Sequence, residues 1–269
     1  MANPSVKGAT KPDLATIAGL ILAGAGIVGG LLLEGGEIHD ISQVTAAIIV
    51  LGGTIGAVLI NTPLPTFLAA MGRMRAVFLE KAAPAAAAVD LIVEYATKAR
   101  KNGVVSLEQD ATNEKDPFLR KALNLAVDGT DMQEIRSMLE LEISIDEHHA
   151  ESEAKVFEAA GGYAPTIGII GAVMGLIQVM KNLSDIDKVG HGIAVSFVAT
   201  VYGVAVANIL FLPMANKIKA RAHEEMRFKE LIVEGILGIV EGLNPKLIRT
   251  KLEAYAPPVP GKTPKAPAA

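Results

Sequence analysis

The sequence predicts an all-α polytopic membrane protein with four transmembrane helices and a helical cytoplasmic domain. The 269 residues are 51% hydrophobic and only 20% charged, with a mean hydropathy of +0.38, whereas a soluble domain is about a quarter charged. Four runs also lack Asp, Glu, Lys and Arg altogether, and each reaches the roughly 20 residues that a helix needs to cross a bilayer. These runs are residues 14–33, 41–72, 159–180 and 189–216.

The distribution of Lys and Arg predicts how the four helices are oriented. Residues 73–158 contain 11 Lys and Arg, and the residues from 217 onward contain 10. The connection at residues 34–40 contains none, and the connection at residues 181–188 contains two. Cytoplasmic segments carry the excess of Lys and Arg, so both termini and the long middle segment are predicted to be cytoplasmic. The first run is too long for a signal-peptide core and is expected to remain as a span in the inner membrane.

Capping residues predict helices within the charged middle segment. An Ala-rich stretch at residues 85–101 is followed by Asn102 and Gly103, a pair typical of a helix C-terminus. Asp116 stands directly before Pro117, as at a helix N-terminus. This second helix is expected to stop near residue 129.

A long helix is expected to follow, capped by Thr130 or Asp131 and running towards Ala159. The fourth apolar run is expected to continue into an amphipathic stretch at residues 217–241, in which residues 231–240 form a packed cytoplasmic helix. The predicted segments are 1–72 (tail and first two spans), 73–158 (cytoplasmic helical domain), 159–216 (last two spans), 217–256 (cytoplasmic C-terminal helices) and 257–269 (a tail disordered by its Pro-rich composition).

Small residues recur at a four-residue spacing in the predicted spans. Such faces let helix backbones approach closely in lipid, where no hydrophobic force drives helices together. The pattern therefore predicts close packing of helices, within the chain or between copies. The residues concerned are the pairs Gly26/Gly30, Gly52/Gly56 and Gly171/Gly175 and the stripe Ala164, Gly168 and Ala172.

The third and fourth spans also carry hydroxyls and prolines. Proline bends or interrupts a helix because it lacks the backbone donor, so a carbonyl freed by Pro165 or Pro213, together with side-chain hydroxyls, would line a hydrated route. The alternative is that Ser and Thr hydroxyls bond their own helix carbonyls. No Asp, Glu, Lys or Arg lies in any of the four runs. If the chain conducts ions, another chain must supply the titrating carboxylate.

Composition argues against several other classes of protein. The chain has no cysteine, which excludes disulfide scaffolds, thiol nucleophiles and cysteine-ligated metal centres. A net charge of −4 gives no basic surface for a nucleic acid. No nucleophile–base pair, metal-ligand cluster or phosphate-binding loop stands out, so we expect neither an enzyme nor a metal or cofactor site.

Three segments resemble one family of membrane proteins. Residues 162–177 (GYAPTIGIIGAVMGLI) and residues 192–203 (GIAVSFVATVYG) are similar to the third and fourth spans of the MotA/PomA flagellar stator family. Residues 13–19 (DLATIAG) are similar to the start of that family. The resemblance covers residues 12–255 and extends, more weakly, to the wider MotA/TolQ/ExbB proton channel superfamily.

The resemblance implies an assembly and a mechanism. Five copies would surround two copies of a MotB-type partner, whose single span brings one Asp per chain. Ion flow would load and unload that Asp, and the pentamer would turn the rotor through FliG. An ExbB/TolQ-type energy-transducing subunit that drives a periplasm-spanning partner is the alternative, and a helical membrane scaffold without conduction is a third hypothesis.

The resemblance also assigns roles to residues. Arg100, Lys101 and Glu108 match positions that contact the rotor, whereas Gln109 and Ala111 replace acids found in some members and Asp110 is a substitute. Pro165 and Pro213 match prolines that couple ion movement to helix movement. The ion path carries over to Tyr163, Thr166, Ala172 and Thr200. Ala172 stands where sodium-driven members often have Thr, which favours protons, with sodium as the alternative if Thr166 compensates.

Overall fold

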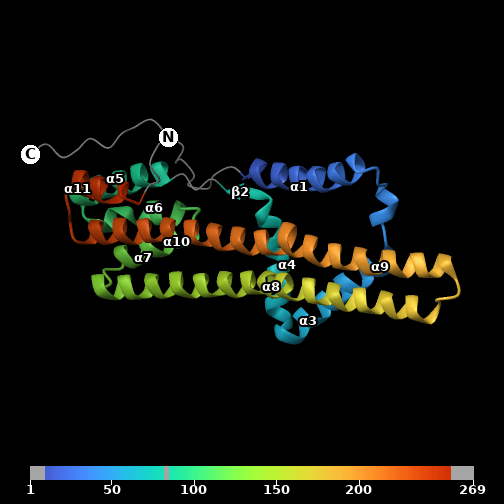
Figure 1. The fold of residues 1–269 in the computed structure, drawn as a ribbon. Helices are drawn as coiled ribbons and strands as arrows, with labels where there is room; N and C mark the ends of the chain where they lie inside the picture. Colours follow the sequence, from blue (N-terminus) through green and yellow to red (C-terminus); the bar gives the residue numbers. More distant parts are fainter. Residues whose placement is uncertain (1–9, 82–84, 256–269) are drawn as a thin grey trace, which may run out of the picture. The chain divides into compact units, whose positions relative to one another are not determined.

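The computed structural model describes residues 10–81 and 85–255, almost all of them in helices (Figure 1). The predicted tail at residues 257–269 lies outside the described residues. The chain divides into two compact units. The span unit comprises residues 11–80 and 148–222, and the described part of the charged unit comprises residues 10, 81, 85–147 and 223–255.

Four helices in the described part of the chain are long and apolar enough to cross a membrane. This confirms the predicted number of spans. They are Leu14–Leu33, Ile38–Asn61, Met132–Lys181 and Ile186–Val240, of which the last three include residues in irregular or charged stretches.

The first span is the helix α1, Leu14–Leu33, and its bounds equal those of the first charge-free run. Asp13 caps it, because its carboxylate accepts a hydrogen bond from the Thr16 backbone N–H at 3.0 Å. Gly35 follows the helix in a left-handed conformation with φ +82°, which glycine adopts without steric cost.

The second span fills only part of the second charge-free run, which extends to residue 72. A short 3₁₀ turn, η1, opens the segment, and the span ends at Asn61. Thr62 is extended (φ −130°, ψ 133°) because it precedes Pro63, whose ring disfavours the helical conformation of the residue before it. The helix α4 then starts again at Leu64. The elements are η1 (Ile38–Ile41), α2 (Val44–Ala47), the π-helical η2 (Ile48–Gly52), α3 (Gly53–Asn61) and α4 (Leu64–Val77).

The third span is part of one 50-residue helix, α8, Met132–Lys181. Asp131 rather than Thr130 caps it, since its carboxylate accepts from the Gln133 N–H at 2.8 Å. The predicted long helix towards Ala159 is confirmed, and it continues through Ala159 into the third span without a break. Gly161 serves packing, because an added Cβ would lie 2.6 Å from the Leu212 side chain.

The fourth span and the C-terminal amphipathic stretch are likewise continuous helix, as predicted. The residues at 231–240 form the buried last turns of this helix and not a separate one. Asn244 caps the final helix, because its side-chain oxygen accepts a hydrogen bond from the Lys246 N–H at 3.0 Å. The elements are α9 (Ile186–Ala205), the π-helical η4 (Val206–Phe211), α10 (Leu212–Val240) and α11 (Pro245–Glu253).

The charged unit packs its helices around an aliphatic core that includes the fully buried Ile92, Leu123, Leu139 and Ile236. The predicted caps are confirmed: Gly103 has φ +81°, and the Asp116 carboxylate accepts from two backbone N–H groups at the start of α7. The remaining elements are α5 (Ala85–Asn102), the 3₁₀ turn η3 (Val104–Leu107), α6 (Glu108–Asn113) and α7 (Pro117–Val127).

The structure contains a two-stranded sheet that the sequence did not predict. Strands β1, Thr10–Pro12, and β2, Leu79–Lys81, pair into a two-stranded sheet. Three residues are too few for an alternating pattern to reveal a strand, and the partners are almost 70 residues apart.

Candidate functional site

The second half of α8 and α9 meet backbone to backbone through small residues. A Cβ added to Gly168 would lie 2.8 Å from the Ala199 carbonyl oxygen, and one added to Gly203 would lie 3.1 Å from the Gly168 Cα. A Cβ on Gly171 would lie 2.8 Å from the Ala199 Cβ. All are shorter than the 3.4 Å at which ordinary contacts begin. The predicted close packing is therefore confirmed for this face of the third span.

The glycine pairs of the first two spans behave differently. A Cβ added to Gly26, Gly30, Gly52 or Gly56 would meet nothing within 4 Å. Only the neighbouring Gly53 is tightly packed, against Ile167 of α8. These four positions are therefore open within the single chain.

Hydroxyl groups along α8 and α9 bond backbone carbonyls. Ser196 is buried, and its hydroxyl donates to the Ala172 carbonyl at 2.8 Å across the contact, with the Gly192 carbonyl 2.9 Å away. One turn later the Thr200 hydroxyl lies 3.3 Å from the Ser196 carbonyl. The exposed Thr166 donates to the Tyr163 carbonyl at 2.8 Å. The structure thus brings Ala172 and Thr200 to one helix contact and leaves Thr166 on the surface of the chain.

Three other predicted residues lie elsewhere in the span unit. Tyr163 is half-buried against a cluster that includes Val58 and Phe157. Pro165 lies inside α8, which continues through it without a break. Pro213 likewise lies in continuous helix, at the start of α10 and two residues after the π-helical segment η4. A π segment is a frequent feature of functional sites in helices.

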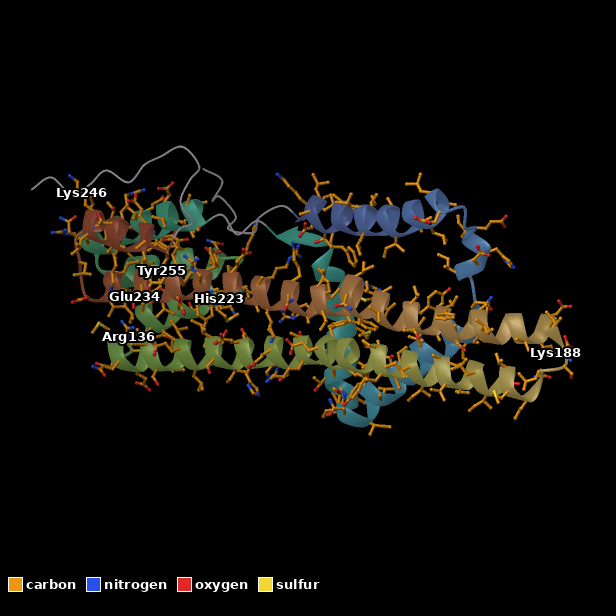
Figure 2. The ribbon with its side chains drawn as sticks, viewed as in Figure 1. Arg136, Lys188, His223, Glu234, Lys246 and Tyr255 are labelled. Atoms are coloured by element: carbon orange, nitrogen blue, oxygen red, sulfur yellow. The ribbon has the colours of Figure 1, made fainter. Side chains whose placement is uncertain are left out.

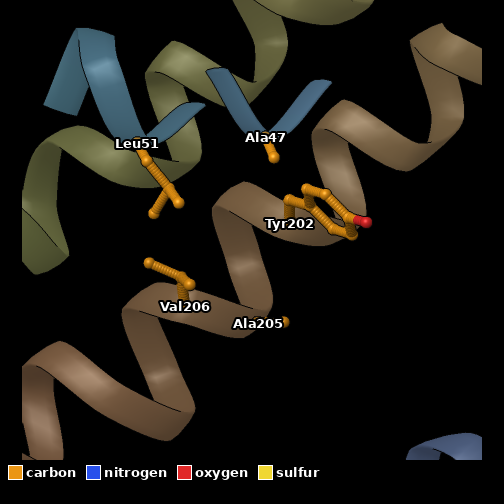
Figure 3. Close-up of a pocket in the computed structure, with 5 residues that line it drawn as sticks. All are labelled: Ala47, Leu51, Tyr202, Ala205 and Val206. Atoms are coloured by element: carbon orange, nitrogen blue, oxygen red, sulfur yellow. The ribbon is translucent and has the colours of Figure 1, made fainter. Parts of the chain in front are cut away.

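A small apolar cavity of about 210 Å³ separates the second span from the fourth (Figure 3). Ala47 and Leu51 line one side, and Tyr202, Ala205 and Val206 line the other.

The Tyr202 phenol joins the fourth span to the start of the second span by two hydrogen bonds. It donates to the Ile41 carbonyl at 2.5 Å and accepts from the Gln43 backbone N–H at 3.3 Å. Ser196 and Tyr202 thus tie α9 to two different neighbours.

A buried ion cluster lies at the N-terminal end of α1 and was missed by the sequence reasoning. Asp13 is 5% exposed, and its carboxylate lies 2.6 Å from both the Lys217 ammonium and the Arg221 guanidinium. The Lys217 hydrogen bond, the Thr16 N–H and the Arg221 hydrogen bond hold the Asp13 pKa well below its usual range. The capping position of Asp13 and the four-residue spacing of the two cations were readable, but their pairing across 200 residues was not.

The predicted rotor-contact residues lie at the turn from α5 to α6 in the charged unit. Arg100 and Lys101 are in the last turn of α5, and Glu108 is in the first turn of α6. All three are exposed, and within the described residues none of them makes an ion pair. Asp110 is different, because Lys98 binds it at 2.6 Å.

A second ion network joins the helices α8, α10 and α11 of the charged unit. Arg136 on α8 pairs with Glu234 on α10 at 3.0 Å (Figure 2), and Lys251 on α11 contacts the same carboxylate. Burial raises the pKa of Glu234, but the hydrogen bonds from Lys251 and Arg136 outweigh it and lower that pKa. Three helices are therefore joined at one carboxylate.

Comparison with known proteins agrees with this architecture. Sequence models of the MotA/TolQ/ExbB proton channel family and of the motility protein A N-terminal region match residues 110–230 and 17–103. The motility protein A of Bacillus subtilis (strain 168) is 34% identical over 246 residues, which is 91% of each chain. The chain belongs to the motility protein A family.

Solved structures of this family have the same fold. The structure of C. jejuni MotAB matches with a TM-score of 0.87 at 30% identity, covering 94% of this chain and all of that one. The flagellar MotAB stator complex from Bacillus subtilis matches with a TM-score of 0.84 at 33% identity, covering 91% and 96%. As a motility protein A, this chain is a stator subunit and a multi-pass inner-membrane protein. The match of its N-terminal region to a motility protein A model argues against the ExbB/TolQ alternative.

Proposed function

We propose that this motility protein A combines with a MotB-type single-span partner to form an ion channel, and that ion flow through it turns the rotor through FliG. In this proposal five copies of the chain surround two partner chains. Both termini, residues 73–158 and residues 217–256 lie in the cytoplasm. The proposal is supported by the likeness to MotAB complexes over almost the whole chain.

The observation that carries the proposal is that the α8–α9 contact contains polar hydroxyls but no Asp, Glu, Lys or Arg. The contact contains glycines, alanines and hydroxyls that already bond carbonyls, with Ser196 and Thr200 as the central pair. The apolar runs contain no Asp, Glu, Lys or Arg. In this proposal the carboxylate that carries the proton belongs to the partner span, because the only imidazole in the four runs, His191, is exposed near the start of α9.

Conduction is tested by expressing the chain with and without its partner. The chain alone should leave the membrane ion-tight, and the chain with an unplugged MotB-type partner should make it leaky. A leak from the chain alone would contradict the proposal. Replacing the partner's span Asp with Asn should close the leak while the complex still forms.

The same assay identifies the ion. Ala172 lacks the hydroxyl that Thr has at this position in many sodium-driven members, and that hydroxyl could replace water around Na⁺, a hard cation that prefers oxygen ligands. The leak and the motor speed should therefore depend on pH and not on the sodium concentration. If motor speed instead saturates with sodium and vanishes without it, Thr166 and Thr200 become the candidate ligands. Thr200→Val, which keeps the shape and removes the hydroxyl, should then abolish rotation.

The rotor contact is tested by reversing charge at the turn from α5 to α6. Arg100→Glu and Glu108→Lys should each impair rotation without changing membrane insertion or partner binding, because both side chains are exposed and unpaired in the described part of the chain. Arg120→Glu is the matched control, since Arg120 is an exposed cation of the neighbouring α7.

A compensating charge reversal on FliG should restore rotation to either variant. If both reversals rotate normally, or if the Arg120 control is impaired to the same degree, these two residues do not contact the rotor. Lys101, next to Arg100 and equally exposed, is expected to contribute less unless both are reversed.

A further inference from the structure

A second and larger cavity lies beside α1 in the span unit. Its volume is about 360 Å³. One wall is a face of α1 with Ala15, Gly19 and Ala23 at successive turns. The opposite wall comes from η4 and the start of α10, and includes Pro213 and Met214.

The cavity exists because α1 presents small residues to a wall of larger ones. A Cβ added to Gly19 would meet nothing within 4 Å, and no residue of α1 is buried by the rest of the chain. Protein interiors are close-packed, and an unfilled gap loses the dispersion contacts of every atom that lines it. Both of these walls belong to helices that are long and apolar enough to cross a membrane, so acyl chains are the apolar groups available to fill the gap.

One end of the cavity carries positive charge. Lys217 lines it, and Arg221 lies one turn further along α10. The two cations share the single carboxylate of Asp13, so the cluster keeps one net positive charge. The Lys217 ammonium has three N–H donors, of which the Asp13 bond at 2.6 Å uses one. Donors and charge are therefore left for an anion.

We propose that the cavity binds one anionic phospholipid. An acyl chain fills the space between Gly19 and Met214, and the headgroup phosphate sits against the Lys217 ammonium and the Arg221 guanidinium. An apolar slot with a cationic end is complementary to a lipid of this kind, and basic residues at the end of a span attract anionic headgroups. The proposal requires only that the spans are in the membrane, and it is independent of ion conduction and of the rotor contact.

The test measures the phospholipid that stays with the chain. The full chain is purified from the membrane in its native assembly and washed extensively in mild detergent. The retained phosphatidylglycerol and phosphatidylethanolamine are then quantified per chain. Gly19→Leu fills the slot from a position with open space around it. Gly24→Leu is the matched control, because Gly24 is also unobstructed on α1 but does not line the cavity.

The wild type and Gly24→Leu should retain one phospholipid per chain, mostly phosphatidylglycerol, and Gly19→Leu should lose most of it. Lys217→Gln neutralises the cationic end and should retain phospholipid without preferring phosphatidylglycerol. Equal retention by Gly19→Leu and the wild type would overturn the proposal, as would a wild type that retains none.

A change of oligomeric state in Gly19→Leu without loss of lipid would show that a second copy fills the slot, and this too would overturn the proposal. Rotation is measured on the same variants. A wild type that retains phospholipid but does not drive rotation would refute the proposed rotor contact and leave the lipid result standing.

Discussion

Gly203→Ala tests the backbone contact between α8 and α9 most directly. The added methyl would lie 2.5 Å from the Ala164 carbonyl oxygen and 3.1 Å from the Gly168 Cα. Both neighbours are backbone, so neither can rotate away. To restore an ordinary contact of 3.4 Å, the helices must move apart by about 0.9 Å at this level.

The energetic cost follows from that displacement. Overpacking of this kind costs about 1–3 kcal/mol. A separation of about 0.9 Å would also stretch the 2.8 Å bond from Ser196 to the Ala172 carbonyl beyond hydrogen-bonding distance, at about 1 kcal/mol. The higher helix propensity of alanine stabilises the helix by about 1 kcal/mol relative to glycine and offsets part of this cost. The net destabilisation is therefore about 1–3 kcal/mol.

The measurement is thermal unfolding of the solubilised chain followed by circular dichroism. A loss near 2 kcal/mol should lower the Tm by roughly 4–8 °C, by the scaling that holds for chains of this size. Gly190→Ala on the same helix is the control, because a Cβ there meets nothing within 4 Å and only propensity changes. If the Tm of Gly203→Ala equals that of Gly190→Ala, α8 and α9 do not touch at Gly203, and the reasoning is refuted.

Two further predictions concern polar anchors of the span unit. Asp13→Asn keeps the helix cap but leaves two cations without their anion, and should cost about 2–3 kcal/mol, less than a fully buried pair because both cations are partly exposed. Because the folded Asp13 pKa is lowered, its stabilisation is complete above pH ~4 and is lost as pH falls further. Wild-type melting temperatures should therefore drop in acid more than those of Asp13→Asn, and parallel curves would contradict the ion cluster. Tyr202→Phe leaves the Ile41 carbonyl and one N–H without a partner, and should cost about 1–2 kcal/mol. A Tyr202→Phe variant that melts like the wild type would show that the phenol does not anchor the second span.

The spans were readable from the sequence because a bilayer imposes a simple rule on composition. The charge-free run of 20 residues predicted both ends of the first span correctly, because the charged residues Asp13 and Glu34 stand directly before and after it. The same rule overextended the second span. Its charge-free run continues past Pro63, and the local restriction that proline places on Thr62 decided the helix end.

The turn from α5 to α6 was also readable, because its signals are local, whereas its contact with the rotor stays a prediction. Gly103 marks the end of α5, and the residues around it follow at fixed short spacings. The Asp13 cluster was not readable, since its partners Lys217 and Arg221 meet it only through the fold. Residues that are close in sequence reveal caps and turns, whereas ion pairs between distant segments require the folded chain.

The two anchors of the span unit bound the segment where the fourth span departs from regular α-helix. Tyr202 is held to the start of the second span, and Lys217 is held to Asp13 at the start of the first. Between them lie the π-helical residues Val206–Phe211 and then Pro213. A helix fixed at two points can change length or rotation only between them. Between Tyr202 and Lys217, η4 is the stretch that departs from α-helical hydrogen bonding, and such π segments occur frequently at functional sites. We therefore expect helix movement coupled to Pro213 to occur within η4 and to leave the α8–α9 contact above it packed.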